Sequence, residues 1–174
     1  MEPVFLRALE LDDLERTHKW HNDPDLYSSL TGTFRYVSMS AERKWIEKKA
    51  EFNNCEISLA ICESKTKRHI GNIYLREISW IDRRAGLAIF IGEKDARSKG
   101  YGQSAVKQLV RYAFDELNLQ KISLPVLVDN KVAQHIYEKC GFTTEGTLKR
   151  HVYKNGQFKD VLVMGICADD SSSK

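Results

Sequence analysis

The chain is predicted to be a mixed α/β (α+β) protein. Stretches with strand and helix periodicity follow one another as strand, two helices, three strands, helix, strand, helix and two strands. The three consecutive strands are joined by short turns, which predicts an antiparallel meander. A single long amphipathic stretch then separates two further strands, which predicts one crossover helix. These observations favour one sheet with helices packed against it.

The N-terminal part is expected to form a strand and then a helix. Residues 4–8 alternate weakly between apolar and polar side chains, as in a strand. The helix is expected to begin at Asp12 or Asp13 and to end before Pro24, because a residue that precedes proline avoids helical angles. Its candidate buried positions are Leu11, Leu14, His18 and Trp20.

A second helix is expected after residues 25–37, which show no clear period and indicate a loop or a short helix. It starts within residues 38–40, where Ser40 is a suitable N-cap. Its apolar face is formed by Trp45, Ile46, Lys49 and Phe52. Strands are then predicted at 57–62 and 69–77, joined as a hairpin by the polar turn between them.

The central part contains the clearest periodicity of the chain. Residues 82–92 include the near-continuous apolar run LAIFI, which is typical of a covered central strand. The helix expected from 102 to about 117 places apolar residues at spacings of 3-1-3-1-3, namely Val106, Leu109, Val110, Ala113, Phe114 and Leu117. Its regular stripe predicts burial against the sheet.

The C-terminal part is predicted to contain three strands and one helix. Pro125 lies within the strand 121–128 and removes a ladder hydrogen bond, which indicates an edge, a bulge or a local splay. A short helix at 130–140 ends at Gly141. Strands 142–152 and 158–167 are joined across Asn155-Gly156, a strong hairpin signal.

Composition limits the classes of function. The chain has 174 residues, 42% hydrophobic and 29% charged, and a net charge of +3 spread along its length. These values predict one domain at 1–168 with a polar tail at 169–174, and do not predict nucleic-acid binding. No signal peptide or membrane span is visible. The four cysteines lack C-x-x-C spacing, which indicates reduced thiols, no metal site and a cytoplasmic protein.

A basic loop with two glycines precedes the long helix. It reads Arg97-Ser98-Lys99-Gly100-Tyr101-Gly102, and the N–H groups of the following helix point back at it. Such a loop favours phosphate binding, although a plain tight turn is the simpler alternative. A P-loop is excluded because no G-K-[ST] follows. A dinucleotide fingerprint, Gly100-x-Gly102-x-x-Ala105, is opposed by the seven residues between the strand and the first glycine.

The same loop fits [RQ]-x-x-G-x-[GA], the pyrophosphate signature of GNAT N-acetyltransferases. A second stretch, Asn130-x-x-Ala133-x-x-x-Tyr137-Glu138-Lys139-x-Gly141-Phe142-x-x-x-Gly146, resembles the signature that follows strand five in that family. The resemblance covers about 82–166 and extends to the order of the elements. Residues 151–160 and Trp20-His21-Asn22-Asp23 are similar to the RimJ/RimL-like and spermidine acetyltransferase branches.

The resemblance implies a mostly antiparallel sheet that splays between strands four and five. It also implies acetyl-CoA as cosubstrate, no metal, and direct attack of an amine on the thioester. The pantetheine arm would enter at the splay. The residues implied for cofactor binding are Ile89, Phe90, Ile91, Arg97, Ser98, Lys99, Gly100, Tyr101, Gly102, Gln103, Asn130, Ala133, Tyr137 and Lys139.

Tyr137 aligns with the family tyrosine that faces the CoA sulfur, which implies a general acid for the leaving thiolate. From residue type alone it is equally a core aromatic, and Asn130 is equally a helix cap. The general base is open, because Gly86 stands where many relatives carry a glutamate. The candidates for the base are Glu77, Asp82, His69, His151 or a water molecule. Acidic residues that would line an amine pocket, or simply face solvent, are Asp23, Asp25, Glu42 and Glu47.

The function expected from these features is N-acetylation of a primary amine. A protein N-terminal amine or a small-molecule amine leads. A polyamine or an amino sugar is the alternative, and Gly86 weakens the polyamine because a cationic chain prefers an acidic pocket. A non-catalytic acyl-CoA-binding module is the alternative of another class. A homodimer is compatible with the resemblance, and no nucleic-acid or membrane partner is expected.

Overall fold

The computed structural model describes residues 2–51 and 53–168, which form helices around one seven-stranded sheet. The sheet order is β1-β2-β3-β4-β5-β7-β6, and every neighbouring pair is antiparallel except β4–β5. This arrangement confirms the predicted fold class. The strands are β1 (Val4–Ala8), β2 (Ile57–Glu63), β3 (His69–Ser79), β4 (Arg84–Ile91), β5 (Lys121–Leu127), β6 (Thr143–Lys154) and β7 (Gln157–Cys167).

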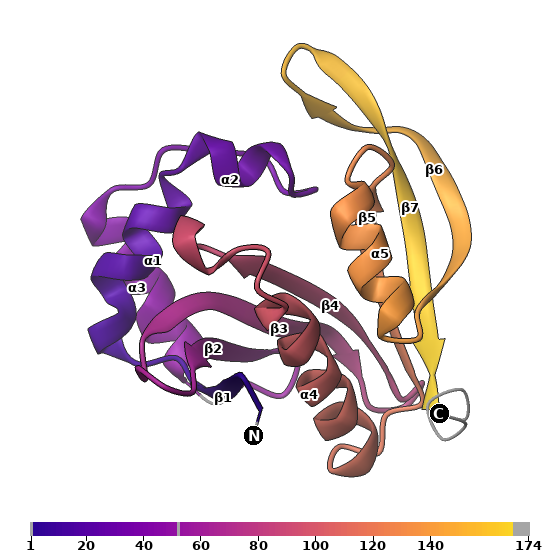
Figure 1. The fold of residues 1–174 in the computed structure, drawn as a ribbon, viewed down its shortest axis with the longest axis horizontal. Helices are drawn as coiled ribbons and strands as arrows, with labels where there is room; N and C mark the ends of the chain where they lie inside the picture. Colours follow the sequence, from indigo (N-terminus) through magenta and orange to yellow (C-terminus); the bar gives the residue numbers. More distant parts are fainter. Residues whose placement is uncertain (1, 52, 169–174) are drawn as a thin grey trace.

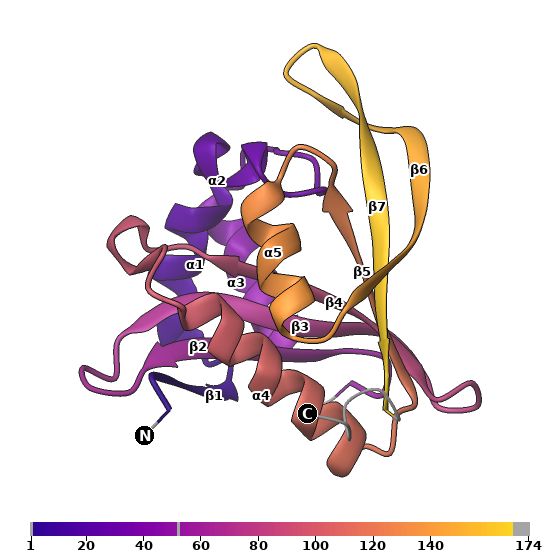
Figure 2. The ribbon, with the colours of Figure 1, turned by 45° about the vertical axis from the view of Figure 1, so that its right-hand side comes forward.

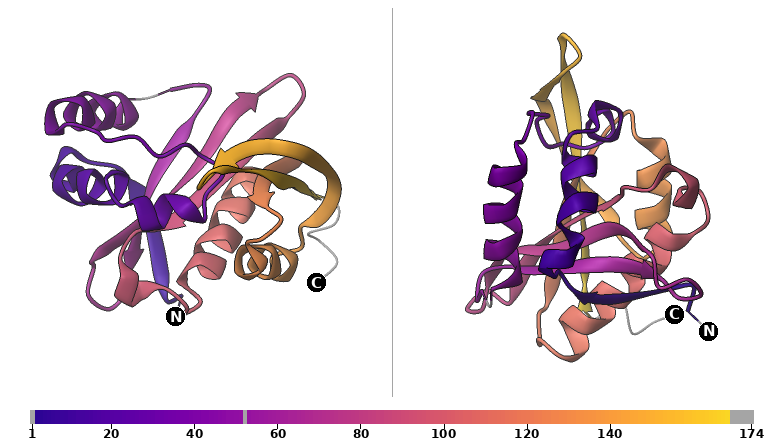
Figure 3. Two further views of the ribbon diagram at one scale, coloured as in Figure 1. Left: turned by 90° about the horizontal axis from the view of Figure 1, so that it is seen from above. Right: turned by 90° about the vertical axis from the view of Figure 1, so that its left-hand side faces the viewer.

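Helices cover both faces of the sheet (Figures 1 and 3). Seen from above, α1 and α3 lie on one face and α4 and α5 on the other (Figure 3). The α-helices are α1 (Leu14–His21), α2 (Pro24–Ser28), α3 (Met39–Ala50), α4 (Tyr101–Asp115) and α5 (Lys131–Lys139). Two short 3₁₀ turns, η1 (Leu11–Asp13) and η2 (Lys94–Ala96), precede α1 and α4.

The sheet opens between β4 and β5. These strands pair only at Arg84–Lys121, Ala85–Ile122 and Gly86–Ser123, and beyond these pairs they diverge. The predicted splay is therefore confirmed. Pro125 lies in the divergent part, where β5 has β7 on one side and no strand on the other. A residue without an N–H group is tolerated there because β4 does not pair with β5 at this position and accepts no ladder hydrogen bond from it.

The predicted stripe of α4 supplies much of the core. Val106, Leu109, Val110 and Ala113 are buried among the main cluster of apolar side chains. The helix ends at Asp115, so Leu117 packs against the core from the following turn. Burial of this stripe brings the N-terminus of α4 under the end of β4, where the basic loop lies.

Two details of the N-terminal half differ from expectation, and a third falls on a residue outside the described part of the chain. Ser38 caps α3, with its hydroxyl accepting from the Ala41 N–H at 3.2 Å, so the predicted cap at Ser40 was wrong. Leu11 is 49% exposed, because it lies in the 3₁₀ turn and does not share the period of α1. Phe52, which was assigned to the apolar face of α3, lies outside the described residues, as does the tail at 169–174.

The segment Trp20-His21-Asn22-Asp23 holds the N-terminal helices on the sheet. Trp20 is buried, and its indole N–H donates to Glu93 at 3.0 Å. A Cβ atom on Gly92 would lie 2.2 Å from the Trp20 ring, so only glycine fits there. Asn22 exchanges two hydrogen bonds with the backbone of Val37, at 2.9 and 3.0 Å. These contacts fix the position of α1 beside the end of β4.

The long β6–β7 hairpin projects beyond the rest of the molecule (Figures 1 and 2). Lys154 of β6 reaches back to α2 and donates to the carbonyl of Tyr27 at 2.9 Å and to that of Gly32. Asn130, which precedes α5, donates to the carbonyl of Ser29 at 3.0 Å. The loop after α2 is thereby tied to the C-terminal half, across the opening between β4 and β5.

Candidate active site

A cavity of about 930 Å³ occupies the opening between β4 and β5. Its walls come from β4, the basic loop and α5 at one end, and from α1, α2 and α3 at the other. Most of the residues predicted for the site line it together: Ile89, Phe90, Ile91, Arg97, Ser98, Gly100, Tyr101, Gly102, Asn130, Ala133 and Tyr137. Their individual roles stay predictions.

Three predicted residues do not line this cavity. Lys99 and Lys139 are exposed, and Gln103 is half-buried, with its carbonyl facing the Cys140 thiol at 3.7 Å. Lys99 and Lys139 remain candidates for a phosphate group that extends beyond the cavity, whereas the side chain of Gln103 has no visible role there.

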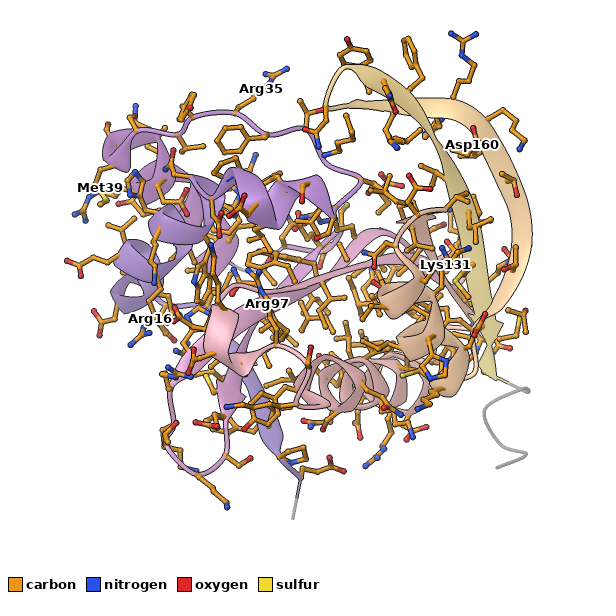
Figure 4. The ribbon with its side chains drawn as sticks, turned by 45° about the horizontal axis from the view of Figure 1, so that its top comes forward. Arg16, Arg35, Met39, Arg97, Lys131 and Asp160 are labelled. Atoms are coloured by element: carbon orange, nitrogen blue, oxygen red, sulfur yellow. The ribbon has the colours of Figure 1, made fainter. Side chains whose placement is uncertain are left out.

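The basic loop is held in shape by its own arginine. The Arg97 guanidinium donates to the carbonyls of Ile91 at 3.0 Å and Gly92 at 3.1 Å, which ties the loop to the end of β4. Figure 4 shows Arg97 within the body of the molecule, whereas Arg35 points to its periphery. Ser98 and Gly100 have left-handed backbone angles, with φ of 61° and 78°.

Gly100 is the N-cap of α4, and no side chain caps this helix end. The N–H groups of the first turn therefore remain available to an anion, and the helix dipole favours negative charge there. The geometry supports the predicted pyrophosphate site.

Gly102 provides a direct test of this loop. A Cβ atom placed on it would come no closer than 4.0 Å to any neighbour, the side chain of Ile91, so a larger residue fits the fold and extends into the cavity. We expect Gly102→Leu to weaken acetyl-CoA binding about tenfold in calorimetric titration, with Gly102→Ala weakening it less. Unaltered binding in the leucine variant would contradict the loop assignment.

Tyr137 lies in α5 with its side chain almost fully buried, and its ring packs against Phe142. The pKa of Tyr137 is raised to about 12. Burial is the main cause, and the nearby Cys140 adds a smaller effect in the same direction. The phenol is therefore neutral throughout the physiological range and keeps its O–H donor. This protonation state suits the predicted general acid.

Asn130 acts as a cap in this structure. Its side-chain oxygen accepts from the Ala133 N–H at 3.0 Å, and its amide group donates to Ser29. Both ends of the amide thus have partners within the chain. These contacts support the capping alternative over direct binding of pantetheine.

The four candidates for the general base are all outside the cavity lining. Glu77, Asp82 and His151 are exposed, and His69 is buried beside Asp13, with its Nδ1 atom 2.9 Å from a carboxylate oxygen. This Nδ1 atom makes no hydrogen bond, so the contact with Asp13 is a close approach only. None of the four is placed to reach an acceptor in this cavity.

Only one of the four acidic residues suggested for an amine pocket lines the cavity, namely Glu42, which is 1% exposed. Asp23 and Asp25 lie near Lys94, and Glu47 is exposed. Both oxygens of Glu42 contact the Nδ1 atom of His21, at 2.8 and 2.9 Å. Sequence reasoning gave His21 no catalytic role and named it only within a segment that resembles the family, because 21 residues separate it from its partner Glu42.

The comparisons with known proteins agree with this geometry. Residues 4–143 match the family model described as an acetyltransferase (GNAT) domain. The chain belongs to the GNAT acetyltransferase family. It is an acetyl-CoA-dependent N-acetyltransferase, so the dinucleotide and non-catalytic alternatives are set aside.

Among its relatives, this GNAT enzyme is 35% identical to a spermidine N(1)-acetyltransferase of Vibrio cholerae, over 94% of this chain and 92% of that protein. It is 29% identical to the spermidine N(1)-acetyltransferase of Escherichia coli K12, over 94% and 85%. A Vibrio cholerae spermidine N-acetyltransferase solved with CoA and spermine superposes with a TM-score of 0.91 at 32% identity, covering 99% of this chain and 100% of that one. The RimJ/RimL-like assignment stays a prediction.

The described residues contain neither a membrane-spanning helix nor a cluster of metal ligands. No helix in this part of the chain is long and apolar enough to cross a membrane. Within 2–51 and 53–168, no group of three or more histidine, cysteine or acidic side chains is arranged to hold a metal ion.

Proposed function

We propose that this GNAT enzyme acetylates a small aliphatic primary amine. The observation that carries the proposal is the end of the cavity formed by α1, α2 and α3. The one carboxylate of the described lining, Glu42, belongs to this end, and the lining also includes the aromatic rings of Tyr27, Trp45, Tyr74 and Phe90. Aromatic faces attract an alkylammonium group and pack against its methylene groups. An amine in this end would face the thioester of a cofactor seated on β4.

The cofactor would lie on the open edge of β4. Ile89, Phe90 and Ile91 pair with β3 on one side and have no β5 partner on the other. Their free backbone groups suit the pantetheine arm, and a backbone N–H here would polarise the thioester oxygen. The amine nitrogen would then attack the carbonyl carbon, the C–S bond would break, and Tyr137 would protonate the thiolate.

A polyamine is the second candidate, because the relatives named above are spermidine acetyltransferases. The charge of this cavity favours an acceptor with one ammonium group instead. Its described lining contains one carboxylate and two arginines, Arg76 and Arg97, and Gly86 supplies no acid on β4. A second ammonium group would therefore lie without a partner.

The test is a thiol-release assay with acetyl-CoA and a panel of acceptors: butylamine, spermidine, an N-terminal peptide and an amino sugar. We expect butylamine to have a kcat/KM about fivefold above that of spermidine, which corresponds to about 1 kcal/mol of uncompensated charge. A clear preference for spermidine would refute the monoamine as the acceptor and favour the polyamine instead. Release only with the peptide or the sugar would refute the aliphatic class.

We further infer that the enzyme works as a homodimer in the cytoplasm. Tyr153 and Phe158, which stack on the projecting hairpin, are 61% and 55% exposed and suit a contact between copies. One related Vibrio cholerae enzyme is dodecameric, so the number of copies needs its own measurement. Light scattering should give the mass of two chains, and a single-chain mass would refute the dimer.

The thiols of Cys55, Cys62 and Cys140 carry no disulfide, which supports a reducing compartment.

A further inference from the structure

We propose that His21 accepts the proton of the acceptor ammonium and that Glu42 positions its imidazole. The inference deepens the proposed function and rests on it. An amine is nucleophilic only after it has lost a proton, so the acceptor end of the cavity needs a group with a free lone pair. The residues that were suggested from the sequence for this role do not line the cavity.

The geometry of the pair defines the roles of its atoms. Glu42 is buried in the first turn of α3, and both of its oxygens lie within 2.9 Å of Nδ1 of His21 at the end of α1. A carboxylate accepts hydrogen bonds, so Nδ1 carries the proton of the neutral ring. The lone pair is then on Nε2, and His21 lines the cavity. The carboxylate on Nδ1 also fixes the orientation of the ring, as the carboxylate partners of functional histidines do.

Neighbouring rings hold the imidazole in place. Trp45 of α3 meets it edge-on at a centroid distance of 4.7 Å, and Phe90 of β4 at 6.1 Å. Phe90 belongs to the part of β4 that would carry the pantetheine arm. The contact therefore brings His21 beside the expected position of the thioester.

The other ionisable groups at this end do not suit the role. Tyr74 is buried and Tyr27 is half-buried, and burial raises the pKa of each, so both remain neutral donors. Arg76 is a permanent cation whose guanidinium stacks on the Tyr74 ring at 4.7 Å. Of the described side chains that line this end, the pair of His21 and Glu42 is left as the proton acceptor.

The proton balance is complete with these groups. The acceptor R–NH₃⁺ gives one proton to Nε2 of His21, which passes it to solvent after the reaction. The nitrogen lone pair forms the C–N bond, and the C–S bond breaks with its electron pair going to sulfur. The nitrogen loses its second proton to solvent as the amide forms, and the thiolate takes a proton from the Tyr137 hydroxyl, which regains one from solvent. The products are the acetamide, CoA and one proton in solution.

The experiment measures acetyl transfer to two acceptors of similar size, by the parent enzyme and by the variants His21→Gln and Glu42→Gln. Propylamine is protonated near neutral pH, whereas trifluoroethylamine is mostly neutral and needs no base to free its lone pair. We expect His21→Gln to lower kcat/KM about thirtyfold with propylamine and less than about threefold with trifluoroethylamine. Glu42→Gln should show the same selectivity with a smaller loss. The matched control is His135→Gln, because His135 is 64% exposed on α5 and outside the cavity.

Equal losses with the two amines would overturn the inference, because a merely structural role would lower both rates alike. Full activity of His21→Gln with propylamine would overturn it as well. Acetyl-CoA affinity is expected to match that of the parent enzyme, and the melting temperature of each variant shows that it is folded at the assay temperature. Transfer by the parent enzyme to either amine tests the proposed function separately. If it acetylates neither, the inference falls with the proposed acceptor class.

Discussion

Replacing Tyr137 with phenylalanine is expected to lower kcat about a hundredfold while acetyl-CoA affinity changes less than about twofold. The phenol lies in α5 on the wall of the cavity and is almost fully buried. Phenylalanine keeps the ring against Phe142 and removes only the proton donor. The leaving thiolate would then have to take its proton from water. Stopped-flow or steady-state thiol release, together with calorimetric titration of acetyl-CoA, measures the two quantities.

The pH dependence follows from the same burial. The raised pKa of about 12 keeps the donor form of Tyr137 present as the pH rises through the usual assay range. Activity should therefore show no decline from this phenol below strongly alkaline pH. Tyr112→Phe, on the half-exposed outer side of α4, serves as the control and should retain full activity. Normal turnover of Tyr137→Phe would remove the tyrosine from the mechanism.

Replacing Asp13 with asparagine is expected to destabilise the fold by about 2 kcal/mol at neutral pH. Asp13 is 3% exposed and accepts two hydrogen bonds of 2.7 Å from the guanidinium of Arg7. The Glu10 N–H adds a third at 3.0 Å. The expected loss of stability is smaller than is usual for a broken buried pair, because Arg7 is 35% exposed and its charge is partly screened by solvent. Urea denaturation of the two proteins measures the difference.

The sign of the pH effect follows from the pKa of Asp13. Burial alone would raise that pKa, but the hydrogen bonds from Arg7, the contact with His69 and the Glu10 N–H together lower it. A carboxyl with a lowered folded-state pKa contributes stability above the unfolded value of about 4, and this contribution is lost as the pH falls through the folded-state value. The difference in free energy of unfolding between wild type and Asp13→Asn should thus become smaller in acid.

The neighbouring residue provides the matched control for this stability prediction. Asp12 is exposed, so Asp12→Asn should change the free energy of unfolding by no more than about 0.5 kcal/mol. A gap between wild type and Asp13→Asn that stays constant from neutral to acid pH would show that shape, and not charge, accounts for the loss.

Much of the cofactor end could be predicted from the sequence because its parts are local. The loop from Arg97 to Gly102 lies directly before the helix whose N–H groups it uses, and the apolar stripe of α4 fixes which side of that helix faces the sheet. Period and turn chemistry depend on neighbours a few residues away, and these are visible in a linear chain. Pro125 likewise indicated an edge, a bulge or a splay, because a residue without an N–H group fits few places in a sheet, and the structure shows that the splay is the one realised.

The acceptor end could not be predicted in the same way, because its groups come from distant segments. His21 and Glu42 meet only because Trp20 packs on Gly92 and Asn22 holds Val37, which together bring the end of α1 against α3. The same packing leaves Asp23, Asp25 and Glu47 outside the cavity lining. A charged residue read from sequence shows its chemistry but not the direction in which its helix will present it.

The sequence by itself therefore determined the order of the elements, the basic glycine-containing loop before the long helix and the family resemblance, since each depends on local spacing. The tertiary structure decided which carboxylate is buried, which histidine meets it, and that Asn130 is engaged as a cap. These outcomes depend on how helices pack across a sheet, where a contact between residues far apart in the chain is selected by shape and burial.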